Sequence, residues 1–218
     1  MDKGNNEPEI NRKIIDSLED LIFICRELNC QFRIFGSLIP AALKGEFYRE
    51  IGDIDCFIGK EFKEDIADRF KKIGYIKSTK RDEDIPTFLY FLGFRTETFI
   101  KDNNKLSLLF VSFKEEYMEI SLRFGLSFRT PYNLINKTYK FFGKEFKGSI
   151  PEAALFLFPF AKDKTKRRID FDALFPFCNP NAIQKIKNTN TFFWFGKRLP
   201  LISKILASKI DKLFLNKF

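Results

Sequence analysis

A strand, a glycine turn, a short helix and a second strand follow one another within one short segment, and this order constrains the fold most. Residues 31–35 alternate in character as a short strand does, and Gly36–Ser37 follows at once. A short helix comes next, with Pro40 in its first turn and Gly45 as its C-terminal stop. Residues 54–58 read as the second strand. Helices and strands therefore alternate here.

The same alternation continues along the chain. Apolar residues at helical spacing predict an amphipathic helix over 9–28 and another over 62–73. Residues 106–113 and 117–122 are expected to form a hairpin, with a turn at 114–116. After Pro131 the pattern becomes mainly helical. We therefore expect an α+β fold, with a mixed sheet flanked by helices and a mainly helical C-terminal part.

Composition excludes several kinds of chemistry. The chain has 218 residues, 44% of them hydrophobic and 31% charged, which is typical of a globular protein. It contains no histidine, so a Ser-His-Asp triad, a histidine zinc site and a histidine general base are excluded. The first ten residues lack the apolar core of a signal peptide, and the uncharged apolar stretches are too short to span a bilayer. We expect a cytoplasmic protein.

Charge is distributed unevenly. Residues 130–218 hold 17 basic and 6 acidic residues, whereas residues 1–129 hold 21 and 23. This asymmetry suggests a metal-binding part beside a part that accepts polyanions, although a solvated basic surface would give the same pattern. We expect a catalytic core over residues 1–125 and a basic region over 126–218 that packs on it.

The candidate site consists of a glycine turn and three acidic residues. Glycine lets the backbone approach a ligand closely, and the Ser37 hydroxyl could hold phosphate oxygens beside Gly36. Asp53 and Asp55 are two apart on a strand, so their carboxylates share a face, and a bound Mg²⁺ would relieve their repulsion. Glu119, at the centre of a later strand, could complete a metal pair or accept a proton.

The stretch FRIFGSLIPAALKGEFYREIGDIDCFI resembles the signature of the polymerase-β-type nucleotidyltransferase superfamily, and in detail its small bacterial and archaeal members, which include antibiotic-modifying and toxin-type enzymes. The resemblance covers residues 10–125. The positions that match the signature are Gly36, Ser37, Ala42, Leu43, Gly45, Arg49, Asp53, Ile54 and Asp55, and the third carboxylate of the family falls on Glu119.

This resemblance implies metal-dependent transfer of a nucleoside monophosphate from a nucleoside triphosphate to an acceptor hydroxyl, with release of pyrophosphate. Two Mg²⁺ ions, with Mn²⁺ as a substitute, would be held by Asp53, Asp55 and Glu119, and Glu119 would also serve as the base. Gly36 and Ser37 would hold the outer phosphates. Arg49 would either steady the triphosphate or pair with a neighbouring glutamate. The acceptor could be a small molecule, a protein side chain or an RNA end.

Two other functions remain open. The spacing of the motif is similar to that of the choline-phosphotransferase-like branch, which acts on cell-surface glycans, although Ile51–Gly52 replaces the Trp-Asp-Asp run of that branch. An inactive nucleic-acid-binding module using the basic part is the alternative from a different class.

Two helical segments of the C-terminal part also allow two roles each. The basic helix predicted over 161–174 either packs on the core or contacts the nucleotide. An apolar stripe over residues 201–214 either docks on the core or contacts a membrane surface or a partner.

Overall fold

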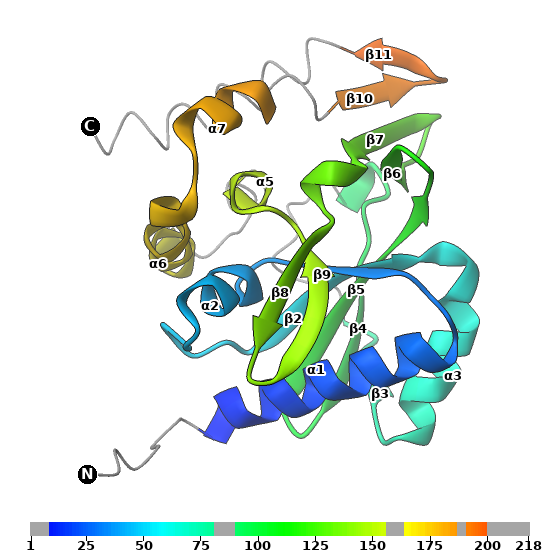
Figure 1. Cartoon of the computed structure of the whole chain (residues 1–218). Helices are drawn as coiled ribbons and strands as arrows, with labels where there is room; N and C mark the ends of the chain where they lie inside the picture. Colours follow the sequence, from blue (N-terminus) through cyan, green and yellow to red (C-terminus); the bar gives the residue numbers. More distant parts are fainter. Residues whose placement is uncertain (1–8, 81–89, 156–163, 187–190, 200–218) are drawn as a thin grey trace.

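The computed structural model describes residues 9–80, 90–155, 164–186 and 191–199 (Figure 1). The α-helices are α1 (Glu9–Glu27), α2 (Leu38–Lys44), α3 (Lys63–Lys72), α5 (Pro151–Leu155), α6 (Lys164–Leu174) and α7 (Pro180–Ile186). The strands are β1 (Phe32–Phe35), β2 (Asp53–Gly59), β3 (Ile76–Lys77), β4 (Glu97–Lys101), β5 (Asn104–Phe113), β6 (Tyr117–Ser121), β7 (Leu126–Pro131), β8 (Lys137–Phe141), β9 (Lys144–Gly148), β10 (Thr191–Trp194) and β11 (Lys197–Leu199).

The strands form one mixed sheet. Its main path runs β11-β10-β7-β6-β5-β2-β1-β9-β8, and β4 pairs with both β5 and β3 beside this path. The β2–β5 and β1–β9 pairs are parallel, and the other pairs are antiparallel. The expected α+β class, a mixed sheet flanked by helices, is confirmed.

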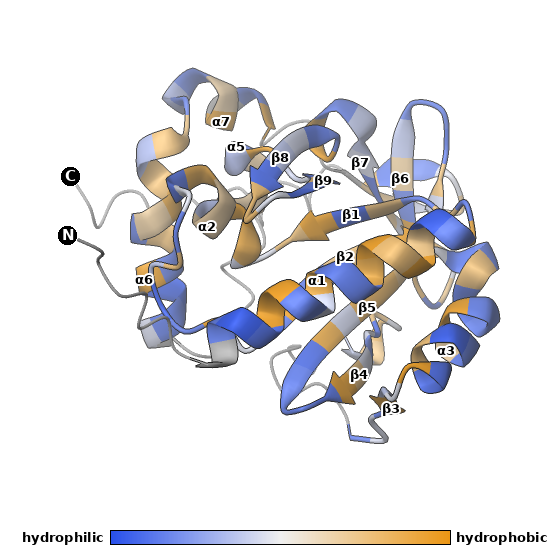
Figure 2. Cartoon of the chain, turned by 60° about the horizontal axis from the view of Figure 1, so that its bottom comes forward, coloured by the Kyte–Doolittle hydropathy of each residue, from blue (hydrophilic) through white to orange (hydrophobic). Residues whose placement is uncertain are grey.

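One face of the central strands is covered by α1 and α3. Ile54, Cys56 and Ile58 of β2 are buried in a cluster with the apolar stripe of α1 and with Ile66 and Phe70 of α3. Figure 2 shows α1 lying across the strands, with hydrophobic and hydrophilic residues alternating along its ribbon, as in an amphipathic helix. Because side chains alternate along a strand, the odd-numbered residues of β2 lie on the opposite face.

The opposite face carries a second, smaller cluster. Phe57 of β2 packs there with Leu109 and Val111 of β5 and with Met118 and Ile120 of β6. Phe35 of β1 stacks on Phe57 with ring centroids 4.1 Å apart. Asp53 and Asp55 belong to the same face as Phe57, so the two carboxylates lie at one end of an apolar surface.

The expected amphipathic helix, the two strands around the glycine turn and the hairpin of β5 and β6 are all present. The structure adds β4, which the sequence pattern did not predict. After residue 126, the described residues contain β7 to β11 besides α5, α6 and α7, so this part is less helical than expected. The sheet also runs across the expected boundary at 125/126, because β7 pairs with β6 and β9 with β1.

Two expectations about membranes meet different outcomes. The apolar stripe over residues 201–214 lies outside the described residues. Among the residues that are described, no helix combines the length and the apolar character needed to cross a bilayer.

Candidate active site

The centre of the candidate site is the contact between Gly36 and Asp55. Phe35, the last residue of β1, pairs with Asp55 of β2 in the antiparallel register, and Gly36 follows with a φ of +75°. A Cβ atom at Gly36 would lie 2.3 Å from Oδ2 of Asp55. The carboxylate therefore lies directly against the glycine backbone, and any larger residue would displace it.

Asp53 and Asp55 are half-buried, whereas Ile54 between them is fully buried. This pattern follows from strand alternation, which points both carboxylates to the same face and packs Ile54 against the helices on the other face. On the parallel neighbour β5, the residues at the same level are Lys105 opposite Asp53 and the buried Ser107 opposite Asp55. The neighbour of Asp55 on β5 is thus the hydroxyl residue Ser107 and not another acid.

Ser37 is held by a buried ion pair between two distant parts of the chain. Nε of Arg49 donates to Oδ1 of Asp170 at 2.6 Å, and Nη2 donates to Oδ2 at 2.9 Å, so the pair is bidentate. The Ser37 hydroxyl donates to Oδ2 of Asp170 at 3.1 Å and accepts a further hydrogen bond from Nη2 of Arg49. Asp170 comes from α6, which packs against α2. The fold thereby fixes the hydroxyl next to Gly36.

The hydroxyl of Tyr48 completes this network by donating to Oδ1 of Asp170 at 2.6 Å. Burial, followed by the nearby charge of Asp170, raises the pKa of Tyr48, so this hydroxyl remains a donor throughout the physiological range. Burial alone would lower the pKa of Arg49, but the hydrogen bonds and charge of Asp170 outweigh it and the pKa is raised. Asp53 contributes to the same shift, so its charge acts on Arg49.

In the described part of the chain, Arg49 does not make the ion pair with a neighbouring glutamate that was one of its two expected roles, and the other role, steadying the triphosphate, stays a prediction. A guanidinium has five N–H donors, and here four hydrogen bonds join it to Asp170, Ser37 and the carbonyl of Glu50. It pairs with neither the Glu46 nor the Glu50 side chain among the ion pairs of the described residues. Arg49 therefore orients Ser37 and anchors α6.

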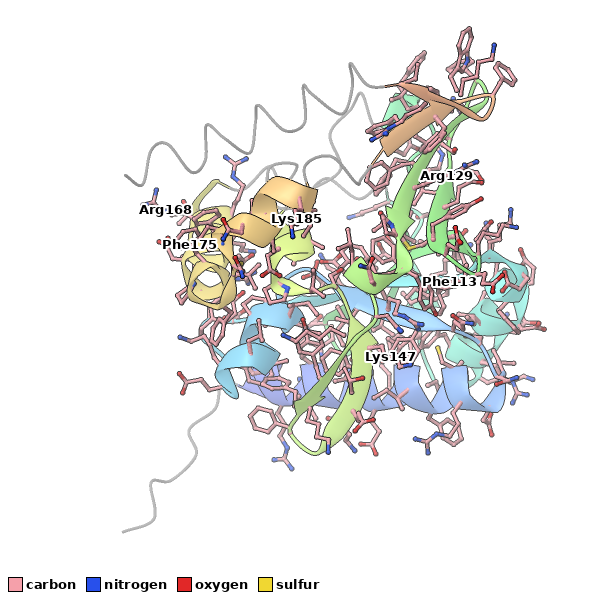
Figure 3. All side chains as sticks on the ribbon, turned by 45° about the horizontal axis from the view of Figure 1, so that its top comes forward. Phe113, Arg129, Lys147, Arg168, Phe175 and Lys185 are labelled. Atoms are coloured by element: carbon pink, nitrogen blue, oxygen red, sulfur yellow. The ribbon has the colours of Figure 1, made fainter. Side chains whose placement is uncertain are left out.

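Glu119 does not lie near the two aspartates. It pairs with Ser112 of β5, five positions along the strand from Ser107, which is the residue level with Asp55. Its carboxylate accepts from Nε of Arg129 at 2.5 Å and from the Ser127 hydroxyl at 3.3 Å. Figure 3 shows Arg129 of β7, the ion-pair partner of Glu119, and Arg168 of α6 on opposite sides of the molecule.

The reason for this difference is the face of the sheet. Strand alternation correctly predicts that Met118 and Ile120 are buried together and that Glu119 points the other way. However, Met118 and Ile120 pack with Phe57 and Leu109, which are on the same face as Asp55. Glu119 therefore points to the face away from the aspartates.

The donor set fits a divalent cation only in part. Two close carboxylates on one face supply the hard oxygen ligands that Mg²⁺ takes from proteins, with the remaining positions open to phosphate oxygens and water. Within the described residues, no group of three acidic or cysteine side chains is placed to hold a metal ion. The aspartate pair therefore fits one ion shared with a phosphate group, and the third ligand expected at Glu119 is not there.

No protein-family model matches the sequence, and no curated protein matches it. Among solved structures, the antibiotic-resistance factor ANT(2″)-Ia is similar in its solution structure, with a TM-score of 0.58 at 11% identity over 80% of this chain and 89% of its own. The chain has the fold of the polymerase-β-type nucleotidyltransferases.

Two further structures agree with this fold. ANT(2″)-Ia in complex with adenylyl-2″-tobramycin gives a TM-score of 0.60 at 12% identity, covering 80% of this chain and 94% of that one. The lincosamide adenylyltransferase LnuA, bound to lincomycin, gives 0.57 at 12% identity, covering 73% and 97%. These TM-scores show that the fold is shared, and at identities this low they show the fold alone. The expected nucleotidyltransferase fold is confirmed.

Tyr48 and Asp170 belong to the site network although the sequence pattern did not predict either of them. Tyr48 immediately precedes Arg49, and Asp170 lies in the predicted basic helix, four residues after Lys166. The sequence does carry a signal for Asp170, which is an acidic residue on the apolar side of a basic helix. An acidic residue buried there needs a polar or charged partner. Asp170 is indeed buried, and Arg49 is that partner.

Proposed function

We propose that this protein is a nucleotidyltransferase that moves a nucleoside monophosphate from a nucleoside triphosphate to an acceptor hydroxyl and releases pyrophosphate. The observation that carries the proposal is the contact of Asp55 with Gly36, beside Asp53. A carboxylate pair next to a glycine turn can hold a cation-bound phosphate group, and a binding module without catalysis has no use for such a pair.

The chain's own residues have distinct roles in this proposal. The backbone at Gly36, which has no side chain in the way, lets the triphosphate approach the carboxylates closely. The Ser37 hydroxyl has one proton, which it donates to Asp170 in this structure, so on nucleotide binding it would exchange that hydrogen bond for one to a phosphate oxygen. Asp53 and Asp55 orient the phosphate to be attacked. Arg49 acts through Ser37 and is a positioning residue.

A divalent cation, which we propose to be Mg²⁺ with Mn²⁺ as a substitute, would be held by Asp53 and Asp55 and would neutralise charge on the triphosphate. Glu119 has no part in this assignment because its carboxylate faces the other side of the sheet.

The acceptor is proposed to be the hydroxyl of a small molecule. ANT(2″)-Ia was solved with an adenylylated aminoglycoside and LnuA with a lincosamide, so the fold accepts bulky polar acceptors of this kind. We therefore propose aminoglycosides and lincosamides as the first acceptors to test, with ATP as the nucleotide.

The test is transfer of label from α-labelled nucleotide to an acceptor panel, with pyrophosphate measured in parallel. The purified chain should label an acceptor only in the presence of Mg²⁺ or Mn²⁺. Replacing Asp53 and Asp55 together by Asn should abolish transfer and cation-dependent nucleotide binding. Transfer of γ-label would identify a kinase, and transfer of choline phosphate from a cytidine donor would identify the glycan-modifying alternative.

A matched control removes a carboxylate outside the site. Glu119→Gln should leave turnover within about twofold of the unchanged chain, since general-base loss would cost on the order of 10²-fold or more. A large loss of turnover in Glu119→Gln, with the fold intact, would contradict the site assignment.

A further inference from the structure

Four large aromatic side chains are exposed together at one edge of the molecule. Phe91 is 62% exposed, Phe124 61%, Trp194 49% and Phe195 74%. We call these four residues the aromatic tip. A folded protein ordinarily buries side chains of this size, so a cluster of exposed ones marks an interaction site.

The aromatic tip is a single structure built from three segments. The rings of Phe91 and Phe124 are 5.8 Å apart, and those of Trp194 and Phe195 are 5.5 Å apart. Nε1 of Trp194 donates to the carbonyl of Phe124 at 3.0 Å, and the amide of Phe195 donates to the carbonyl of Gly125 at 2.8 Å. Figure 1 shows the β6–β7 and β10–β11 turns at the same edge of the sheet, where β7 pairs with β10.

The two hairpin turns that present Phe124 and Phe195 place a bulky aromatic residue in an unfavourable backbone conformation. Phe124 and Phe195 have φ values of +58° and +45°, and each is followed by a glycine with positive φ. Such hairpin turns favour Asn or Asp at the first position, as in the β4–β5 turn, where Asp102 and Asn103 have φ values of +51° and +69°. Phenylalanine in this conformation is strained, and strain retained at the surface indicates that the exposed ring has a use.

Within the described segments that build the aromatic tip, the charged side chains have one sign. Arg123, Lys197 and Arg198 are exposed beside it, and the three segments 90–95, 121–129 and 191–199 contain no acidic residue. Aromatic side chains among basic ones match the chemistry of an anionic bilayer surface, where rings enter the acyl boundary and cations meet lipid phosphates. Single-stranded nucleic acid would also meet bases with rings and cations.

The geometry favours the bilayer. The two phenylalanines project from the ends of hairpins, whereas a nucleic-acid platform needs rings spread along a surface. The turn backbone is already hydrogen-bonded, with Leu122 and Leu126 donating to the carbonyls of Leu126 and Arg123. Paired backbone groups lower the cost of entering an apolar phase. We propose that the aromatic tip binds anionic lipid membranes, an interaction that goes beyond the proposed transfer reaction.

The test measures co-sedimentation of the full chain with vesicles of phosphatidylcholine, alone or mixed with phosphatidylserine. The chain should bind the mixed vesicles much more strongly, and binding should fall with added salt. Phe124→Asn and Phe195→Asn should each lower partitioning on the order of tenfold, the loss expected for one buried phenyl ring. Both variants should keep or raise the unfolding midpoint, because Asn-Gly suits these turns.

Phe142→Asn is the matched control. Phe142 has a φ of +45° before Gly143 in the β8–β9 turn, the same turn chemistry, but Figure 1 places this hairpin at a different edge. It should leave vesicle binding unchanged. The proposal is overturned if the unchanged chain ignores anionic vesicles, if all three variants bind alike, or if Phe124→Asn and Phe195→Asn lose oligouridylate binding instead. Transfer activity on a soluble acceptor should be unaffected in the two tip variants, so this result and the proposed function fail independently.

Discussion

Gly36 and Gly45 form a natural pair for testing the contact on which the site depends. Both glycines flank α2 and both have left-handed backbone, with φ values of +75° and +73°. A Cβ at Gly36 would lie 2.3 Å from Oδ2 of Asp55, whereas a Cβ at Gly45 would meet nothing within 4 Å. Replacing either glycine by Ala therefore imposes the same backbone strain, but only Gly36→Ala also creates a steric clash, with the carboxylate of Asp55.

The magnitudes follow from that difference. Left-handed backbone costs an Ala residue about 1–2 kcal/mol, so Gly45→Ala should lower the unfolding free energy by that amount and the midpoint by roughly 2–8 °C. Gly36→Ala should cost this and more, because a carbon–oxygen separation of 2.3 Å must open to an ordinary contact. The carboxylate of Asp55 must then move away from its position beside Asp53.

Nucleotide binding should distinguish the two variants more sharply than their unfolding free energies do. Gly45→Ala should bind nucleotide in the presence of Mg²⁺ as the unchanged chain does, measured by calorimetry on protein that circular dichroism shows to be folded. Gly36→Ala should bind nucleotide at least about 10-fold more weakly, because changes that disturb the orientation of a metal ligand typically cost that much affinity. Equal cation-dependent binding by the two variants would refute the assignment of Asp55 to the site.

Two further predictions concern ion pairs. Asp170→Asn leaves Arg49 without its buried carboxylate, so it should cost about 3 kcal/mol of stability and weaken nucleotide binding. Asp172→Asn is the control, because it breaks an exposed pair with Arg168 on the same helix. It should change the free energy of unfolding, measured by chemical denaturation, by less than about 1 kcal/mol. Burial opposes ionisation of Glu97, but hydrogen bonds from Lys63 and Lys77 lower its pKa below the ordinary 4.5, so its ionised form stabilises the fold above that value. Glu97→Gln should therefore lower the unfolding midpoint at pH 7, and this gap should close as the pH falls through the folded pKa of Glu97; a gap independent of pH would contradict the pairing.

Local pattern was sufficient to predict the part of the site that lies within one segment. The glycine turn, the short helix and the two aspartates are close in sequence, and strand alternation alone puts Asp53 and Asp55 on one face. What pattern could not supply was contact between distant segments. Asp170 reaches Ser37 across 133 residues, and only the packing of α6 against α2 brings them together.

Glu119 shows a second limit. Alternation within β6 correctly separates Met118 and Ile120 from Glu119, but it does not say which face of the sheet each set occupies. A place for Glu119 beside Asp53 and Asp55 would require Met118 and Ile120 to be buried on the face opposite the aspartates. In the structure this end of the sheet buries its apolar residues on the aspartate face, because η2 (Tyr132–Leu134) and the residue after it, Ile135, cover that side.

The Phe-Gly dipeptides in the hairpin turns are a feature of the sequence that indicates exposed aromatic side chains, and the sequence predictions above did not include it. The dipeptide joins two strands at 124–125, 142–143 and 195–196, where both residues have positive φ. A fourth copy, at 35–36, is the glycine turn of the candidate site, where only the glycine has positive φ. Local preference would place Asn or Asp at the first position of such a turn, as Asp102 stands in the β4–β5 turn. Sequences generally agree with their fold at every level, so a repeated departure points to a use outside folding. At Phe142 the ring packs on Phe47 and Phe141, which accounts for it; Phe124 and Phe195 face solvent, and a surface for them to enter accounts for both.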